Sequence, residues 1–346
     1  MLVMMTAMSI ASAAPGCAAI SAAIGGGRVC AEVGPGVVIA GDRERADRLN
    51  AIARAAMTRF EANFGRPVPT FAVVETVDGA IGIGVEKALA TAGFAWRMPW
   101  LSEADMEGAY RASIERAVTA KAAAMGFDAA RTRQMVDAAW GQQADRFSSA
   151  ALRKREAGAL PHELAHGWFI HAYWPRAEAR ASDHYGGPAP DWMDEMAAVL
   201  AEDQAMADGR RAQFAVILSG GDAAAKARLL DLATFLSGGH PALPKLDVGA
   251  QKGRVAVLTG AEAAAVAQVA GTFYLQARSF ADYLRARSGG PAAYRSAAAA
   301  FAGGRDTAGW LRDEGASLNL PTTIEAVERD WRAWVAVTPP PSPARG

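Results

Sequence analysis

Five consecutive residues, His162 to His166, place two histidines four positions apart, with Glu163 directly after the first. On an α-helix, residues four apart differ by about 40° in direction and about 6 Å along the axis, so both imidazoles point to one side. Two imidazole nitrogens so placed can bind one Zn²⁺ ion. Glu163 lies about 100° round the helix from His162, where its carboxylate can act as general base toward a metal-activated water molecule. The spacing therefore predicts a zinc centre with hydrolytic chemistry.

The residues that flank this motif are apolar, among them Leu160, Leu164, Trp168 and Phe169. We therefore expect a buried helix, in which ionisable groups are costly unless they hold a metal ion or one another. The alternative is an ordinary helix whose histidines and glutamate are solvated or satisfied in the core. Pro161 suits the first turn of a helix because its missing N–H costs little there, which predicts that the helix begins at this residue.

A catalytic zinc ion usually has three protein ligands and one open position, so a third ligand must come from elsewhere. The best candidate is Glu195. Asp191 can serve as the N-cap of a helix, with Asp194 three residues later, which places Glu195 in an early turn of that helix. The alternative is that Glu195 only complements the helix dipole, together with the neighbouring acid. Three other residues remain candidates for the third ligand: Asp194, His171 and His184.

The spacing of apolar residues in the rest of the chain predicts mostly helices. A helix over residues 44–63 and a buried strand over residues 70–76 indicate a small mixed α/β beginning. Further helices are expected over residues 102–126, 128–147, 161–173, 191–206, 223–236, 261–287 and 322–335. The sequence therefore predicts an α+β, mostly helical fold. Its parts are a mixed N-terminal portion (28–159), a helical catalytic portion (160–336) and a disordered, proline-rich tail (337–346).

Several stretches resemble the gluzincin clan of zinc peptidases, in particular the peptidase MA-like families. They are Leu160-Pro-His-Glu-Leu-Ala-His166 and Trp192-Met-Asp-Glu-Met-Ala-Ala198, the latter in place of the families' Trp-x-x-Glu-Gly-x-Ala. Residues 273–284 look like the helix that follows the third ligand in those families, and residues 311–335 are similar to their usual end. The resemblance thus covers residues 160–335 and implies a zincin-like catalytic portion.

The resemblance implies which residues bind the metal, namely His162, His166 and Glu195. It implies Glu163 as the general base. It also implies a tyrosine that donates a hydrogen bond to the oxyanion of a tetrahedral intermediate, and Tyr274 occupies the matching place. Tyr185 and Tyr283 are alternatives for this role, and Tyr274 could instead only pack in a helix face.

The chain departs from the family pattern in three respects, the third being that the edge strand that pairs with a substrate is not evident. Met196 replaces the glycine that follows the third ligand, which narrows the site. The connection over residues 167–194 is longer than in many members, so we expect an inserted loop beside the active site that holds His171, His184 and Gly186-Gly187. Residues 70–76 are one candidate for the edge strand that pairs with a substrate. His240 stands alone in a glycine- and proline-rich stretch and is most simply a surface residue.

The composition and the N-terminus bear on partners and location. Lys plus Arg (36) balance Asp plus Glu (36), and no basic stripe is present, so nucleic-acid binding is not expected. Residues 1–14 are typical of a signal peptide except that a basic n-region is missing, and an ordinary buried segment is the alternative. Cys17 and Cys30 follow the expected cleavage point and can form a disulfide in an exported chain, two free thiols being the alternative. No later segment is apolar for long enough to span a membrane.

Together these features predict an exported, periplasmic or secreted zinc peptidase. Its substrate is a peptide or protein, and it hydrolyses peptide bonds with Glu163 as general base. The alternative from another class is a non-catalytic exported zinc-binding scaffold that presents its surface to a partner. An enzyme with the same metal centre and a non-peptide substrate is a further alternative. The sequence makes no prediction about the oligomeric state.

Overall fold

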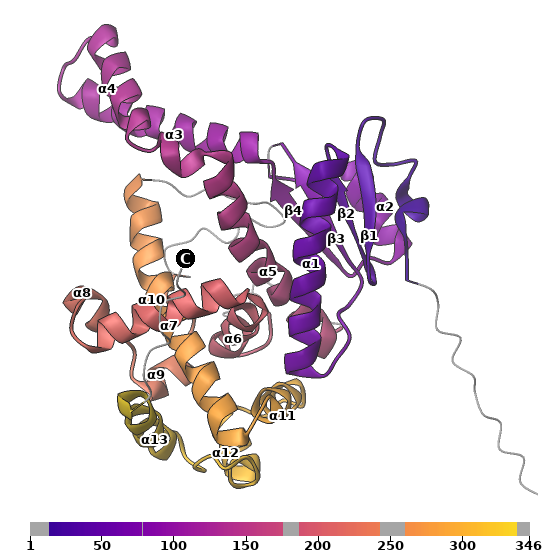
Figure 1. Ribbon diagram of the computed structural model, residues 1–346, viewed down its shortest axis with the longest axis vertical. Helices are drawn as coiled ribbons and strands as arrows, with labels where there is room; N and C mark the ends of the chain where they lie inside the picture. Colours follow the sequence, from indigo (N-terminus) through magenta and orange to yellow (C-terminus); the bar gives the residue numbers. More distant parts are fainter. Residues whose placement is uncertain (1–13, 78, 176–186, 243–259, 338–346) are drawn as a thin grey trace, which may run out of the picture.

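The computed structural model describes residues 14–77, 79–175, 187–242 and 260–337. A small sheet lies at one side of the molecule, and helices form the rest (Figure 1). The predicted α+β, mostly helical fold is confirmed. The expected signal peptide, apart from its last residue, and the expected tail, apart from Val337, lie outside the described residues.

The sheet has four strands in the order β1-β2-β3-β4, which are β1 (Val29–Val33), β2 (Gly36–Ala40), β3 (Phe71–Thr76) and β4 (Trp96–Leu101). The first two strands are antiparallel, and the other neighbours are parallel. Only β3 matches a strand expected from the sequence. Since β3 has a neighbour on each side, it cannot pair with a substrate, and the proposal that residues 70–76 form such an edge strand was wrong. The edges of the described sheet are β1 and β4.

Helices cover both faces of the sheet. α1 (Arg43–Phe64) packs on the face that joins the main core, with Leu49 and Ala53 fully buried. It begins at Asp42, whose side chain accepts a hydrogen bond from the N–H of Arg45, and ends at Gly65, which has φ +66. That end agrees with the predicted helix. The second face is covered by α2 (Ile83–Ala92) and by the 3₁₀ helix η1 (Cys17–Ile20), neither of which was predicted.

The N-terminal 3₁₀ helix is linked covalently to the sheet. Cys17 in η1 and Cys30 in β1 form a disulfide. The pairing expected from the sequence is therefore present, and none of the described cysteines is a free thiol. The bond fixes η1 over the smaller core, where Ile20 is fully buried.

The helical portion follows the sheet. Its elements are α3 (Glu103–Ala124), α4 (Ala129–Gly141), η2 (Ala144–Phe147), α5 (Ser149–Tyr173), α6 (Asp191–Ala201), α7 (Gln204–Leu218), α8 (Ala223–Lys226), α9 (Leu232–Ser237), α10 (Gly260–Ser288), α11 (Ala292–Ala302), α12 (Thr307–Glu314), η4 (Ala316–Leu318) and α13 (Ile324–Val337). The helices α3 and α4 form a hairpin that projects away from the body (Figure 1). The expected helix over residues 191–206 is divided into α6 and α7, and the one over residues 223–236 into α8 and α9. α11 and α12 were not predicted.

The prediction that this helix begins at Pro161 was wrong, because α5 begins at Ser149. The side chain of Ser148 caps it by accepting a hydrogen bond from the N–H of Ala151. Pro161 lies inside the helix, where it cannot donate to the carbonyl group of Ala157. The expected boundary between residues 159 and 160 consequently falls within one continuous helix.

Close packing fixes the second half of α5 against the sheet. A Cβ atom on Gly167 would come within 2.3 Å of the indole ring of Trp96 in β4, so only glycine allows this approach. A Cβ atom on Gly158 would similarly meet the methyl group of Met206 in α7. These two glycines allow α5 to approach β4 and the side chain of Met206 in α7 closely.

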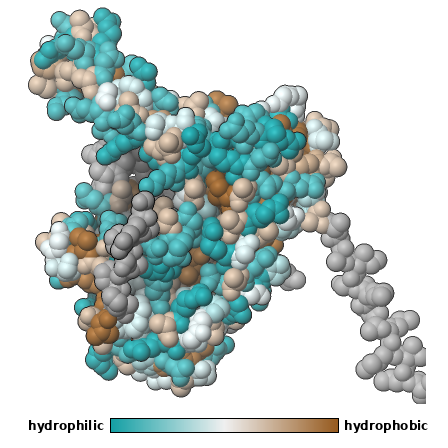
Figure 2. Space-filling model, viewed as in Figure 1, coloured by the Kyte–Doolittle hydropathy of each residue, from teal (hydrophilic) through white to brown (hydrophobic). Residues whose placement is uncertain are grey.

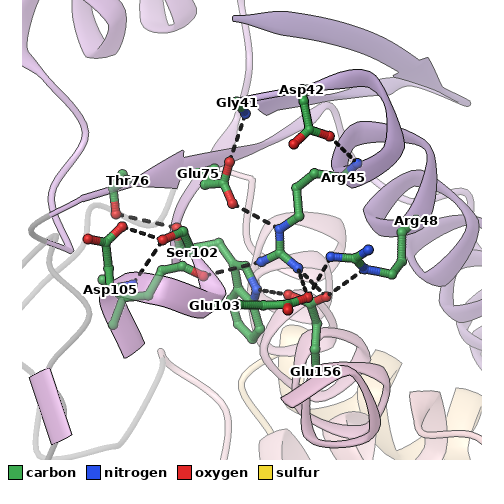
Figure 3. A network of polar contacts seen from close by, with 12 residues as sticks. Gly41, Asp42, Arg45, Arg48, Glu75, Thr76, Ser102, Glu103, Asp105 and Glu156 are labelled. Carbon is green, nitrogen blue, oxygen red and sulfur yellow. Dashed lines mark hydrogen bonds and ion pairs between the residues drawn. The ribbon is translucent and has the colours of Figure 1, made fainter. Parts of the chain in front are cut away.

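A buried polar network ties the first half of α5 to the sheet and to α1 (Figure 3). Arg45 donates to Glu75 of β3 at 2.9 Å and to Glu156 of α5 at 2.5 Å. Glu156 also accepts a hydrogen bond from the indole N–H of Trp100 in β4 at 2.7 Å. Arg48 pairs with Glu103 at the start of α3 at 2.6 Å. One arginine and one glutamate in the core therefore connect four separate elements.

The surface drawn in Figure 2 is mainly hydrophilic, and its brown residues form small, separated patches. Such scattered apolar residues are ordinary for a surface in water. Within the described part of the chain, none of the helices is both long and apolar enough to cross a membrane.

Candidate metal centre

The predicted metal ligands come together where α5 packs against α6. His162 and His166 lie one turn apart on α5, and Glu195 faces them from α6. One nitrogen from each histidine and one oxygen from the glutamate all lie within 4.8 Å of one another. Nε2 of His162 is 3.2 Å from Oε1 of Glu195, and Nε2 of His166 is 3.9 Å from Oε2. The three residues predicted from the sequence are therefore neighbours.

A carboxylate orients each of the two imidazole rings from behind. Nδ1 of His162 lies 2.9 Å from Oε1 of Glu202, and Nδ1 of His166 lies 3.0 Å from Oδ2 of Asp194. Because a carboxylate can only accept, both Nδ1 atoms carry a proton. In the neutral rings the lone pairs then belong to the Nε2 atoms, which face Glu195. Metal-binding histidines in proteins are usually held in this way.

The charges around the two histidines favour a cation. Burial alone would lower the pKa of His162, but Glu195 and Glu202 outweigh it and hold that pKa well above 6.5. Burial also lowers the pKa of His166, but the negative charges of Asp194 and Glu195 outweigh burial and raise that pKa to about 9. The pKa of Glu195 is lowered, because the neighbouring histidines outweigh the effect of its burial. The buried carboxylates thus create a negative field at the point where the Nε2 atoms meet.

The donor set suits a divalent metal ion. Glu195 is only 1% exposed, and neither of its carboxylate oxygens has the geometry of a hydrogen bond to another described residue. Three buried carboxylates, Glu195, Asp194 and Glu202, face one guanidinium, that of Arg210. When both histidines are neutral, as metal ligands must be, a dication would balance the two remaining negative charges. Two imidazoles and a carboxylate are typical ligands of catalytic zinc, whose ligand atoms in a tetrahedral site lie about 3.3 Å apart.

Glu163 lies on the accessible side of the centre. Its side chain is exposed, unlike those of the two histidines, so the expectation that all three ionisable groups are buried was wrong for this residue. The position follows from the helix, since Glu163 is one residue beyond His162 and points about 100° away from it. An exposed carboxylate beside buried imidazoles is in contact with solvent.

Tyr274 of α10 borders the same centre. Its ring centroid lies 5.3 Å from that of His162, in an edge-to-face arrangement. The guanidinium carbon of Arg210 is 5.4 Å from the centre of the Tyr274 ring. Arg210 also pairs with Glu202, with Nε 2.6 Å from Oε2. The tyrosine is therefore held between a histidine of the centre and the arginine that neutralises Glu202.

The other candidates from the sequence take different positions. Asp194 orients His166 and is not among the three converging side chains. His171 packs against Trp96 with ring centroids 6.0 Å apart. Tyr283 donates its hydroxyl hydrogen to Asp330 at 2.8 Å. His184 and Tyr185 lie outside the described residues, as does most of the expected inserted loop. Asp191 does not cap α6, because the helix begins at Asp191 itself after Pro190.

Three residues of the centre were not found from the sequence: Glu202, Arg210 and His240. A signal did exist for Glu202. It follows Glu195 by seven positions, about two helical turns, so at the end of α6 it lies on the same face of the helix as Glu195. His240 was expected at the surface, and this was wrong. It is 2% exposed, and its Nε2 lies 3.9 Å from Oε2 of Glu195. Burial lowers the pKa of His240 to about 4, assisted by the charges of the other two histidines and opposed by Glu195.

Known proteins provide no independent indication of what the centre does. Comparison of the chain with protein-family models, with curated proteins and with solved structures found no match.

Proposed function

We propose that the protein is a zinc-dependent peptidase, with the gluzincin-like centre formed by His162, His166 and Glu195. The observation that carries this proposal is the convergence of two outward-facing imidazole nitrogens on a buried carboxylate whose oxygens have no hydrogen bonds of their own. A buried carboxylate is costly unless positive charge faces it, and a divalent cation supplies that charge once the neighbouring histidines are neutral. Zn²⁺ is the ion that this combination of ligands suits best.

The residues around the centre divide the chemistry among them. Bound zinc would supply Lewis acidity, polarising a scissile carbonyl group and making a water molecule more acidic. Glu163 accepts the proton of the attacking water and passes it to the leaving amine. Tyr274 donates its hydroxyl hydrogen to the oxyanion that develops on the carbonyl oxygen. Asp194 and Glu202 hold the imidazoles with their Nε2 lone pairs toward the metal.

We also propose that the protein works outside the cytoplasm, as a periplasmic or secreted enzyme. Two observations support this. The first is the run of apolar and small residues at the N-terminus. The second is the disulfide between Cys17 and Cys30, since such bonds persist in oxidising compartments and are rare in the cytosol.

Metal analysis combined with cleavage of a diverse peptide library tests the proposed activity. The purified full chain should contain one zinc ion and cleave members of the library. Glu163→Gln should keep the zinc but lose about 10²–10⁴-fold in cleavage rate, because general-base catalysis is lost. Glu115→Gln, which changes an exposed carboxylate on α3, is the matched control and should cleave normally.

Two results would contradict the proposal in different ways. Normal cleavage by Glu163→Gln would show that Glu163 is not the base. Stoichiometric zinc without cleavage of any peptide would favour a non-catalytic zinc-binding scaffold.

A further inference from the structure

We propose that His240 directs an N–H group toward the Glu195 carboxylate and so positions it, and that His240 is not a fourth metal ligand. This inference rests on the metal centre described above and specifies how many positions of the metal the protein leaves open. With three protein ligands the metal keeps a position for water or substrate, whereas a fourth imidazole would close it. The role of His240 therefore separates a catalytic site from a closed structural one.

Three imidazoles surround the carboxylate of Glu195. Oε1 lies 3.2 Å from Nε2 of His162, while Oε2 lies 3.9 Å from Nε2 of His166 and 3.9 Å from Nε2 of His240. Measured from Oε2 of Glu195 alone, His240 lies as near as His166, although it is not among the three residues whose ligand atoms all lie within 4.8 Å of one another. What distinguishes them is the group that each ring meets at its other nitrogen.

The partner of Nδ1 sets the tautomer of each ring. In His162 and His166, Nδ1 faces a carboxylate and must carry the proton, which leaves the lone pair on Nε2. In His240, Nδ1 accepts a hydrogen bond from the backbone N–H of Ala242 at 3.2 Å. An accepting Nδ1 has no proton, so the proton of neutral His240 is on Nε2. The atom that faces Glu195 is consequently an N–H donor, which cannot bind a metal.

The backbone and the neighbouring rings keep His240 in this orientation. Its own N–H donates to Oδ2 of Asp191, at the start of the helix that carries Glu195. The ring packs edge-to-face on Phe273 at 4.8 Å between centroids and lies 5.8 Å from the ring of Tyr274. The residue after His240 is Pro241, which favours an extended backbone at this point. Rotation of the ring to exchange its nitrogens would put Nε2–H against the N–H of Ala242.

A donor directed at Oε2 has a defined effect on Glu195. It would attract Oε2 and leave Oε1, beside Nε2 of His162, as the oxygen available to a bound metal. A carboxylate held in this way would offer one oxygen to the metal and leave a position open for water or substrate. Partners of this kind typically change metal affinity by about 10–100-fold when removed.

Four proteins test the inference: the wild type, His240→Gln, His240→Asn and His240→Leu. Glutamine places an N–H near the position of Nε2, asparagine has the same group one methylene too short to reach Glu195, and leucine has no donor. Zinc affinity is measured by competition with a chromophoric chelator, and the ligand field by the visible absorption of the Co²⁺ form. Thermal unfolding of the metal-free proteins shows whether each variant folds. If leucine at this position prevents folding, the glutamine and asparagine variants still form a matched pair.

If His240 is a positioning donor, the leucine and asparagine variants should bind zinc about 10–100-fold more weakly, and the glutamine variant within about threefold of the wild type. The Co²⁺ absorption of the glutamine variant should match that of the wild type. A changed Co²⁺ spectrum with a large loss of affinity in all three variants would identify His240 as a ligand and overturn the inference. Unchanged affinity in the leucine and asparagine variants would overturn it as well.

These measurements do not depend on peptide cleavage. The expected pattern of affinities without any cleavage would contradict the proposed peptidase and leave the role of His240 intact. A wild-type protein that takes up no zinc or Co²⁺ would contradict both.

Discussion

Glu202 lies 2.9 Å from Nδ1 of His162 through its Oε1 atom and is paired through both of its oxygens with Arg210. Glu202 lies between α6 and α7, at the point where a single helix was expected, and Arg210 lies within α7. Because Arg210 also contacts the ring of Tyr274, one buried ion pair touches both a proposed metal ligand and the proposed oxyanion donor. The interruption of the helix at Glu202 is therefore a feature of the centre and not only of the fold.

We expect Glu202→Gln to weaken zinc binding by about 10–100-fold, because the Nδ1–H group of His162 loses its charged acceptor. Loss of the charge also leaves Arg210 partly buried without its counterion. The measurement is competition with a chelator of known zinc affinity. Glu115→Gln serves as the control, since it removes an equal charge from an exposed position on α3. Equal zinc affinity in both variants would show that Glu202 does not support His162.

Tyr274→Phe should lower kcat for a cleaved peptide by about 10²–10³-fold, the usual effect of removing one oxyanion donor. Zinc affinity should stay within a few-fold of the wild type, because the hydroxyl group is not a ligand. Tyr283→Phe is the matched control on the same helix. Its hydroxyl is bonded to Asp330, so that variant should retain its activity. Equal kcat values for the two variants would exclude Tyr274 from catalysis.

Removal of the metal should destabilise the protein. Zinc bound only to the folded state adds about 4 kcal/mol to the free energy of unfolding when its free concentration is about 1,000 times Kd. Chemical denaturation with added zinc or with a chelator measures the difference. In Glu195→Gln the two curves should coincide, since the charged ligand is gone. A zinc-dependent shift that persists in this variant would mean that the ion binds elsewhere.

The sequence predicts the two-histidine part of the centre well, because the spacing of His162 and His166 is a local consequence of helix geometry. Glu195 was found from a helix start and a resemblance. His240 could not be found in this way, since it reaches Glu195 through a loop whose backbone is bonded to Asp191, a contact 49 positions distant along the chain. Apolar periodicity carries no information about such contacts.

The missed elements of the fold have similar causes. β1 and β2 are each only five residues long, which is too short for a clear alternating pattern. The turn between them does have a sequence signal, in Gly34, with φ +55, and Pro35. β4 contains Pro99, and proline within an apolar run argues against a strand unless that strand is at an edge. β4 does lie at an edge of the sheet, but the order of the strands cannot be read from the sequence. The prediction for Pro161 failed because proline suits the first turn of a helix, whereas this proline lies inside α5.

Replacement of Cys17 by serine, or of both cysteines, should lower the free energy of unfolding by about 2–4 kcal/mol, as expected for loss of a native disulfide. The two residues are 13 positions apart, and the bond restricts this loop in the unfolded chain. Denaturation of the wild type with and without a reductant should reproduce the effect. Alkylation of the unreduced, unfolded wild type should label neither cysteine. Two labelled thiols in protein taken from its native cell would contradict both the bond and the proposed location.

The last prediction concerns the network in Figure 3, in which Arg45 is 7% exposed and Glu156 4%. Arg45→Met should destabilise the protein by about 3–5 kcal/mol, because Glu156 is left buried without its main counterion. Arg43→Met, two positions earlier in α1, removes an arginine whose only described ion pair is largely exposed, and should cost less than about 0.5 kcal/mol. Chemical denaturation of both variants measures the difference. Since Glu156 and His162 lie on the same helix, the network also holds α5 in place, so Arg45→Met should weaken zinc binding where the control does not. Equal stability of the two variants would mean that solvent reaches the network and that it does not fix α5.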